Sequence, residues 1–92
     1  MRESVIESYM RDQVRALGGK AYKFVSPGNA GVPDRLVCLP GGRVAFVELK
    51  APGGKPTALQ MARHRELNKL GHTVMILDSK PAVDEFVKGL MV

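Results

Sequence analysis

Residues 34–50 have the sequence DRLVCLPGGRVAFVELK, which predicts two β-strands joined by a tight turn. Residues 34–39 and 43–49 are rich in branched and other apolar side chains, which pack well on a pleated sheet. Residues 40–42 (PGG) separate the two runs and favour a short reversal of the chain. The stretch is therefore expected to form an antiparallel hairpin.

Helical and extended patterns flank this hairpin on both sides. Residues 3–17 place their apolar side chains on one stripe at helical spacing, and Gly18 and Gly19 follow as a stop. Thr57 and Gln60 fit a capping box, so a second helix is expected with Thr57 as its N-cap. The predicted order is helix 3–17, strand 21–25, loop 26–33, strand 34–39, strand 43–49, loop 51–56, helix 57–70, strand 73–77 and helix 81–90.

The helix between the third and fourth strands acts as a crossover, which predicts that these two strands run parallel. The fold class is therefore α/β, with a mixed β-sheet flanked by helices and a further helix at the C-terminal end. The apolar strand 73–77 (TVMIL) is expected to be covered on both faces, as strands of parallel sheets usually are.

Length and charge narrow the class of protein. The 92 residues fit one domain, 1–92. The chain carries 14 Lys and Arg against 9 Asp and Glu, and its net charge of +5 favours a polyanionic partner such as nucleic acid. The apolar runs are too short to predict a membrane span, and the first residues do not resemble a secretory signal. The lone cysteine, Cys38, favours an intracellular location.

Three charged residues of the hairpin form the candidate site. Asp34 begins the first strand, while Glu48 and Lys50 lie two apart on the second and so face the same way. If the register brings Asp34 beside them, two carboxylates and an ammonium group converge, which suits Mg²⁺ or Mn²⁺. Each residue also has an ordinary alternative, with Asp34 as a turn residue and the other two on a solvated strand face.

The same residues match a nuclease signature. Residues 33–34 (PD) followed by residues 48–50 (ELK) form the PD-(D/E)xK pattern. Together with residues 31–35 (GVPDR), residues 46–52 (FVELKAP) and Gln60, the pattern resembles the virus-type replication-repair nuclease (VRR-NUC) family over nearly the whole chain. The resemblance implies a restriction-endonuclease-like αβββαβ core. It also implies a stand-alone phage or prophage protein that acts in the bacterial cytoplasm.

The resemblance further implies a homodimer that hydrolyses phosphodiester bonds of branched DNA, such as the Holliday (four-way) junction, with Mg²⁺ or Mn²⁺. It implies metal binding by Glu7, Asp34, Glu48 and the backbone carbonyl of Leu49, and catalytic roles for Asp34, Glu48, Lys50 and Gln60. Lys50 would position the attacking water. Glu3 competes with Glu7 for the N-terminal acidic role, and Glu7 is preferred because the apolar stripe flanks it closely. Gln60 is equally explained by the capping box alone.

The remaining basic side chains and the histidines complete the predictions. The candidate DNA contacts are Lys20, Lys23, Arg35, Lys55, Arg63 and Lys69. Arg35 either contacts phosphate or pairs with an acid, and His64 and His72 are expected at the surface or at a helix cap. Two rival functions are another nuclease of the same fold (flap, nicking or restriction-like) and a basic DNA-binding module without catalysis.

Overall fold

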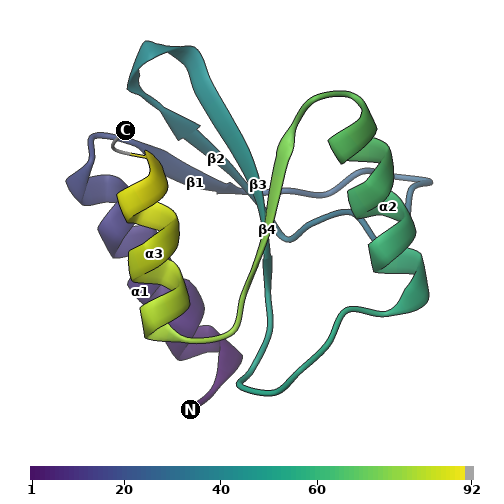
Figure 1. Ribbon diagram of the computed structural model, residues 1–92, viewed down its shortest axis with the longest axis horizontal. Helices are drawn as coiled ribbons and strands as arrows, with labels where there is room; N and C mark the ends of the chain where they lie inside the picture. Colours follow the sequence, from purple (N-terminus) through teal and green to yellow (C-terminus); the bar gives the residue numbers. More distant parts are fainter. Residues whose placement is uncertain (91–92) are drawn as a thin grey trace.

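The structure, a computed structural model, describes residues 1–90, and this part of the chain contains three α-helices and four β-strands (Figure 1). The elements are α1 Glu3–Ala16, β1 Lys20–Lys23, β2 Arg35–Leu39, a 3-10 turn Pro40–Gly42, β3 Arg43–Leu49, α2 Ala58–Lys69, β4 Thr73–Leu77 and α3 Lys80–Leu90. Their order is the predicted one. β1 ends before Val25, which is 71% exposed at the start of the following loop. No helix within these residues is long and apolar enough to cross a bilayer.

The four strands form one mixed sheet in the order β1-β2-β3-β4. β1 and β2 pair antiparallel, and so do β2 and β3, which confirms the predicted hairpin. Gly41 and Gly42 make its turn with φ values of 82° and 76°, which glycine adopts without steric cost. β3 and β4 run parallel and are joined by a crossover through α2, as the sequence predicts.

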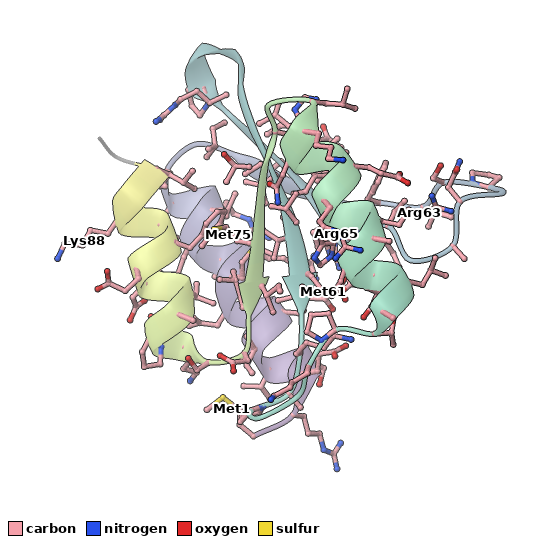
Figure 2. The ribbon with its side chains drawn as sticks, turned by 45° about the vertical axis from the view of Figure 1, so that its right-hand side comes forward. Met1, Met61, Arg63, Arg65, Met75 and Lys88 are labelled. Carbon is pink, nitrogen blue, oxygen red and sulfur yellow. The ribbon has the colours of Figure 1, made fainter. Side chains whose placement is uncertain are left out.

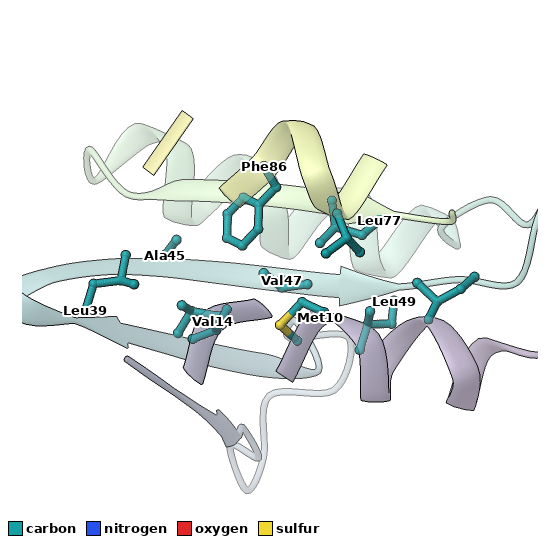
Figure 3. Packing of buried hydrophobic residues seen from close by; sticks show 11 residues of the cluster. Met10, Val14, Leu39, Ala45, Val47, Leu49, Leu77 and Phe86 are labelled. Atoms are coloured by element: carbon teal, nitrogen blue, oxygen red, sulfur yellow. The ribbon is translucent and has the colours of Figure 1, made fainter. Parts of the chain in front are cut away.

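One face of the sheet carries α1 and α3, which lie side by side (Figure 1). The stripe of α1 buries Ile6, Met10 and Val14 completely. Alternate residues of β3 face these helices and complete the apolar core shown in Figure 3. The buried members of this core are Ile6, Met10, Val14, Val37, Leu39, Ala45, Val47, Leu49, Leu77, Val83 and Phe86.

Of the described helices, α2 alone covers the opposite face (Figure 1). It contributes one buried residue, His64. The expectation that β4 is buried on both faces is wrong, because Met75 and Ile76 are 37% and 38% exposed. β4 forms an edge of the sheet, and one helix of 12 residues leaves much of the neighbouring surface open to solvent.

Candidate active site

The hairpin register places Asp34 and Glu48 side by side at one end of β2 and β3. Arg35 pairs with Val47, so the residue before Arg35 lies beside the residue after Val47. The Asp34 carboxylate is fixed by the backbone, because its Oδ2 accepts a hydrogen bond from the Leu49 N–H at 2.8 Å. The register therefore brings Asp34 beside Glu48, as the predicted site requires.

The loop before Asp34 is packed against α2. Gly31 has a φ of +89°, and a Cβ at this position would lie 2.9 Å from the Leu59 side chain, so the close approach requires glycine. Arg63 of α2 donates a hydrogen bond to the Ala30 carbonyl at 2.9 Å. These contacts hold the loop, and with it the start of β2, on the α2 side of the sheet.

Glu48 is the centre of the candidate site and is almost completely buried, with 1% of its surface exposed. Lys50 Nζ lies 3.8 Å from Glu48 Oε2, and Gln60 Nε2 donates to the same oxygen at 3.3 Å. Burial, together with a hydrogen bond and negative charge from Asp34, raises the pKa of Glu48 to about 8, although Lys50 opposes the shift. Two carboxyl groups and an ammonium group thus meet on one face, as the residue spacing predicts.

Gln60 serves the helix cap and the site at the same time. Its Oε1 accepts from the Thr57 N–H at 2.9 Å, and Thr57 Oγ1 accepts from the Gln60 N–H at 3.1 Å, which completes the predicted capping box. The Nε2 end of the same side chain is the group that donates to Glu48. The cap fixes the amide so that its other end points at the carboxylate, which confirms the capping box and leaves a catalytic role for Gln60 as a prediction.

His64 is a residue of the site that the sequence prediction placed wrongly. It is 5% exposed, and its Nε2 lies 3.6 Å from Glu48 Oε1. Burial and the nearby charge of Lys50 lower the pKa of His64, which favours the neutral imidazole. Among residues 1–90, neither of the two facing atoms has a hydrogen-bond partner. The available signal was spacing, since His64 follows Gln60 by four residues and shares its helix face.

The two acidic candidates of α1 have different surroundings. Glu7 Oε2 accepts a hydrogen bond from Arg35 Nε at 3.0 Å, so pairing with an acid is the alternative that Arg35 adopts. Glu3, at the first turn of α1, adds negative charge that raises the pKa of Glu48. The charge of Glu3 therefore acts on the candidate site, whereas Glu7 is engaged by Arg35.

The site residues fit a divalent cation by their chemistry. The described residues do not form a group of three or more His, Cys, Asp or Glu side chains already arranged around a metal position. They do hold the Asp34–Glu48 pair, and within the same part of the chain Glu48 Oε1 is buried without a partner. Adjacent carboxylates repel each other when both are ionised, and a cation removes this cost. Mg²⁺ and Mn²⁺ prefer such oxygen donors and accept one or two carboxylates.

The six basic residues predicted to contact DNA fall into two groups. Exposed at the surface are Lys20, Lys23, Lys55 and Lys69. Arg63 instead braces the loop before Asp34 and pairs with Glu66 at 3.1 Å, and the Arg35 side chain is 12% exposed against Glu7. The four lysines are open to solvent and remain predicted DNA contacts, whereas the two arginines form contacts within the protein.

The αβββαβ order and the carboxylates at the ends of β2 and β3 define the class of the PD-(D/E)xK nucleases. A solved structure described as "VRR_NUC domain" matches with a TM-score of 0.88 and 34% identity, covering 94% of both chains. "Putative nuclease p44" of Acyrthosiphon pisum secondary endosymbiont phage 1 is 58% identical over 80 residues, which is 87% of this chain and 86% of that protein. No family model matches the sequence. On these two similarities, the chain belongs to the VRR-NUC family, and the predicted family and fold are confirmed.

Proposed function

We propose that this chain is a metal-dependent DNA endonuclease that cuts branched DNA, in particular the four-way junction, as a homodimer. The observation that carries the proposal is the convergence of Asp34, Glu48 and Lys50 on one hairpin around a buried carboxylate. The name of the phage relative, a nuclease, supports the reaction class, and the net charge of +5 supports a polyanionic substrate.

We assign metal binding to Asp34, Glu48 and the backbone carbonyl of Leu49. A bound Mg²⁺ or Mn²⁺ ion supplies positive charge that stabilises a phosphodiester transition state. Of the two acids of α1, Glu3 is supported by its electrostatic effect on Glu48, and Glu7 is supported by its match to the family pattern. Either acid would add a further carboxylate to the site.

We assign the remaining chemistry to Lys50 and Gln60. The Lys50 ammonium group, 3.8 Å from Glu48 Oε2, would orient the attacking water and offset negative charge that develops on the phosphate. Gln60 donates to the same oxygen of Glu48 and would hold that carboxylate in one orientation. Lys50 and Gln60 both already contact Glu48, so these roles require no movement of the hairpin.

The homodimer is proposed from the symmetry of the substrate. A symmetric cut of a four-way junction requires two sites related by a two-fold axis, which a C2 dimer supplies. Large apolar side chains on α2 and β4 support self-association, since Met61, Met75 and Ile76 are 40%, 37% and 38% exposed. Met61 and Met75 are labelled in Figure 2. Sedimentation velocity at the concentration used for cleavage should give the mass of a dimer, and a monomer mass would contradict this part of the proposal.

The reaction is tested by cleavage of a labelled four-way junction and of a linear duplex with the sequence of one arm. Each substrate is incubated with Mg²⁺, Mn²⁺ or chelator, using the wild type, Lys50→Ala and the control Lys88→Ala. Lys88 is exposed on α3, and its side chain projects away from the rest of the molecule (Figure 2). We expect metal-dependent junction cleavage that Lys50→Ala reduces by roughly 10²–10³-fold, as for loss of a charge-stabilising group, and that Lys88→Ala preserves.

The other outcomes separate the rival functions. Equal cleavage of the junction and the duplex would retain the nuclease and reject the junction preference. Binding of both substrates without cleavage under any metal condition would reject catalysis and leave a DNA-binding module.

A further inference from the structure

A second basic site lies apart from the candidate active site. Arg11 and Arg15 of α1, Lys20 of β1 and Ala21 line a cavity of about 340 Å³. The two arginines are four residues apart, so they project from the same side of α1 toward the edge of the sheet. We call Arg11, Arg15 and Lys20 the edge cluster.

The edge cluster carries an excess of positive charge. All three side chains are exposed, and among residues 1–90 the acid paired with the cluster is Asp12, which lies 3.5 Å from Arg15. That pair is exposed to water on both sides, so it neutralises little of the local charge. Two like charges at this helical spacing repel each other and destabilise a helix. An anion bound in the cavity would relieve this repulsion.

The sheet register gives the distance between the edge cluster and the catalytic carboxylates. Lys20 pairs with Cys38, and Cys38 pairs with Val44, which precedes Glu48 by four residues on β3. Strand spacing and rise place the Cα atoms of Lys20 and Glu48 about 16 Å apart. The rise of about 3.4 Å per nucleotide is only the axial part of the separation between phosphates of one DNA strand, so this span corresponds to at most about five nucleotides.

We propose that the edge cluster binds a backbone phosphate of the DNA substrate within about five nucleotides of the scissile bond. Guanidinium groups form paired hydrogen bonds with phosphate oxygens, which suits Arg11 and Arg15 to this ligand. Such contacts position the duplex without reading its sequence. The identity of the ligand as substrate DNA rests on the function proposed above, whereas the binding site itself rests on the cavity and its charges.

The inference is tested with Arg11→Gln/Arg15→Gln, in which both arginines are replaced by a neutral residue that is also a good helix former. Lys88→Gln on α3 is the control and gives the effect of removing one charge outside the cavity. Circular dichroism verifies the fold of each variant. Affinity for a labelled junction is measured by fluorescence anisotropy in chelator, where DNA is bound and not cut, at several salt concentrations.

We expect the double variant to bind at least about tenfold more weakly than the wild type and to reduce the slope of log affinity against log salt by about 0.9, as for one lost phosphate contact. Lys88→Gln should change neither quantity appreciably.

Each result bears on the edge cluster separately from catalysis. A double variant with wild-type affinity and salt slope overturns the inference, even if the wild type cleaves DNA as proposed. The inference is also overturned if the double variant lowers the logarithm of the affinity by no more than twice the change caused by Lys88→Gln. The loss of two net charges then explains the whole effect. A specific loss of binding in a protein that never cleaves DNA supports the edge cluster and rejects the proposed nuclease.

Discussion

The two faces of the sheet bury different kinds of side chain, although β3 contributes to both faces. On the α1 and α3 side, β3 contributes Ala45, Val47 and Leu49 to a core in which the apolar side chains are buried. On the α2 side, the same strand presents Glu48, which is buried with His64. Alternation of side chains along a strand allows this division, because neighbouring residues face opposite sides.

The division shows where the stability of this small protein originates. Burial of apolar surface stabilises the α1 and α3 side. Burial of a carboxyl group beside a second carboxyl group is unfavourable unless a proton or a cation compensates, and the raised pKa of Glu48 expresses that cost. The apolar core therefore offsets the cost of burying the two carboxyl groups on the α2 side.

The largest expected effect comes from two adjacent residues of β4 that face opposite sides. Leu77 is 1% exposed in the core, whereas Ile76 is 38% exposed on the α2 side beside Glu48. We expect Leu77→Ala to lower the free energy of unfolding by about 2–5 kcal/mol, as for other buried large-to-small changes. Ile76→Ala should cost less than about 1 kcal/mol. Urea denaturation measures both, and equal losses would show that the two faces contribute alike.

The next effect concerns the pH dependence that Glu48 imposes on metal-free protein. The pKa of Glu48 is raised from 4.5 to about 8 by folding, so the folded chain holds this proton more tightly than the unfolded chain does. The stabilisation is present below pH 4.5 and is lost as the pH rises to about 8. In chelator, the wild type should lose at most about 1.4 kcal/mol per pH unit across this window.

Glu48→Gln is the matched variant for that measurement, because its amide has nearly the same shape and does not ionise. We expect Glu48→Gln to be more stable than the wild type at pH 8 in chelator and to lack the decline. Added Mg²⁺ should flatten the wild-type profile, since the ion favours the ionised carboxylate. Parallel profiles for the two proteins in chelator would contradict a raised pKa at Glu48.

The sequence predicts the order of the helices and strands and the convergence of Asp34, Glu48 and Lys50, for identifiable physical reasons. Residue spacing alone places Glu48 and Lys50 on one face, and turn residues define the hairpin that brings Asp34 to them. The Thr57–Gln60 capping box is also a local pattern, and it is present with both of its hydrogen bonds. Such features depend on residues that are close in sequence, so a single chain is sufficient to find them.

The features that the sequence does not predict are contacts between distant segments. The sequence predicts His64 at the surface or at a cap, because a weakly amphipathic helix does not reveal which side faces the sheet. Its position against Glu48 depends on packing. Burial of β4 was overestimated because the sequence does not show that β4 is an edge strand under a single helix. The pairing of Glu7 with Arg35, 28 positions apart, likewise depends on how α1 crosses the sheet.

A smaller effect separates the two roles of Gln60. Thr57→Ala removes the hydrogen bond from the Gln60 N–H and should cost about 0.5–2 kcal/mol of stability, with cleavage preserved at a temperature where the variant is folded. Gln60→Ala removes the reciprocal hydrogen bond and also the contact with Glu48, so it should reduce the cleavage rate as well. Thermal unfolding and single-turnover cleavage distinguish them. Equal cleavage by both variants would show that Gln60 acts only in the helix cap.

The smallest expected change in stability decides between the acids of α1. Glu7→Gln removes the partner of Arg35, whose side chain is 12% exposed, and should cost about 0.5–1.5 kcal/mol. Glu3→Gln removes an exposed charge that opposes ionisation of Glu48, so it should leave stability almost unchanged and lower the pKa of Glu48. If Glu3 is the additional acid of the site, Glu3→Gln should also slow cleavage in single-turnover assays while Glu7→Gln does not. The reverse result would show that Glu7 leaves Arg35 and joins the site when metal and DNA bind, which makes the Glu7–Arg35 pair a competitor of the metal site instead of part of the fold alone.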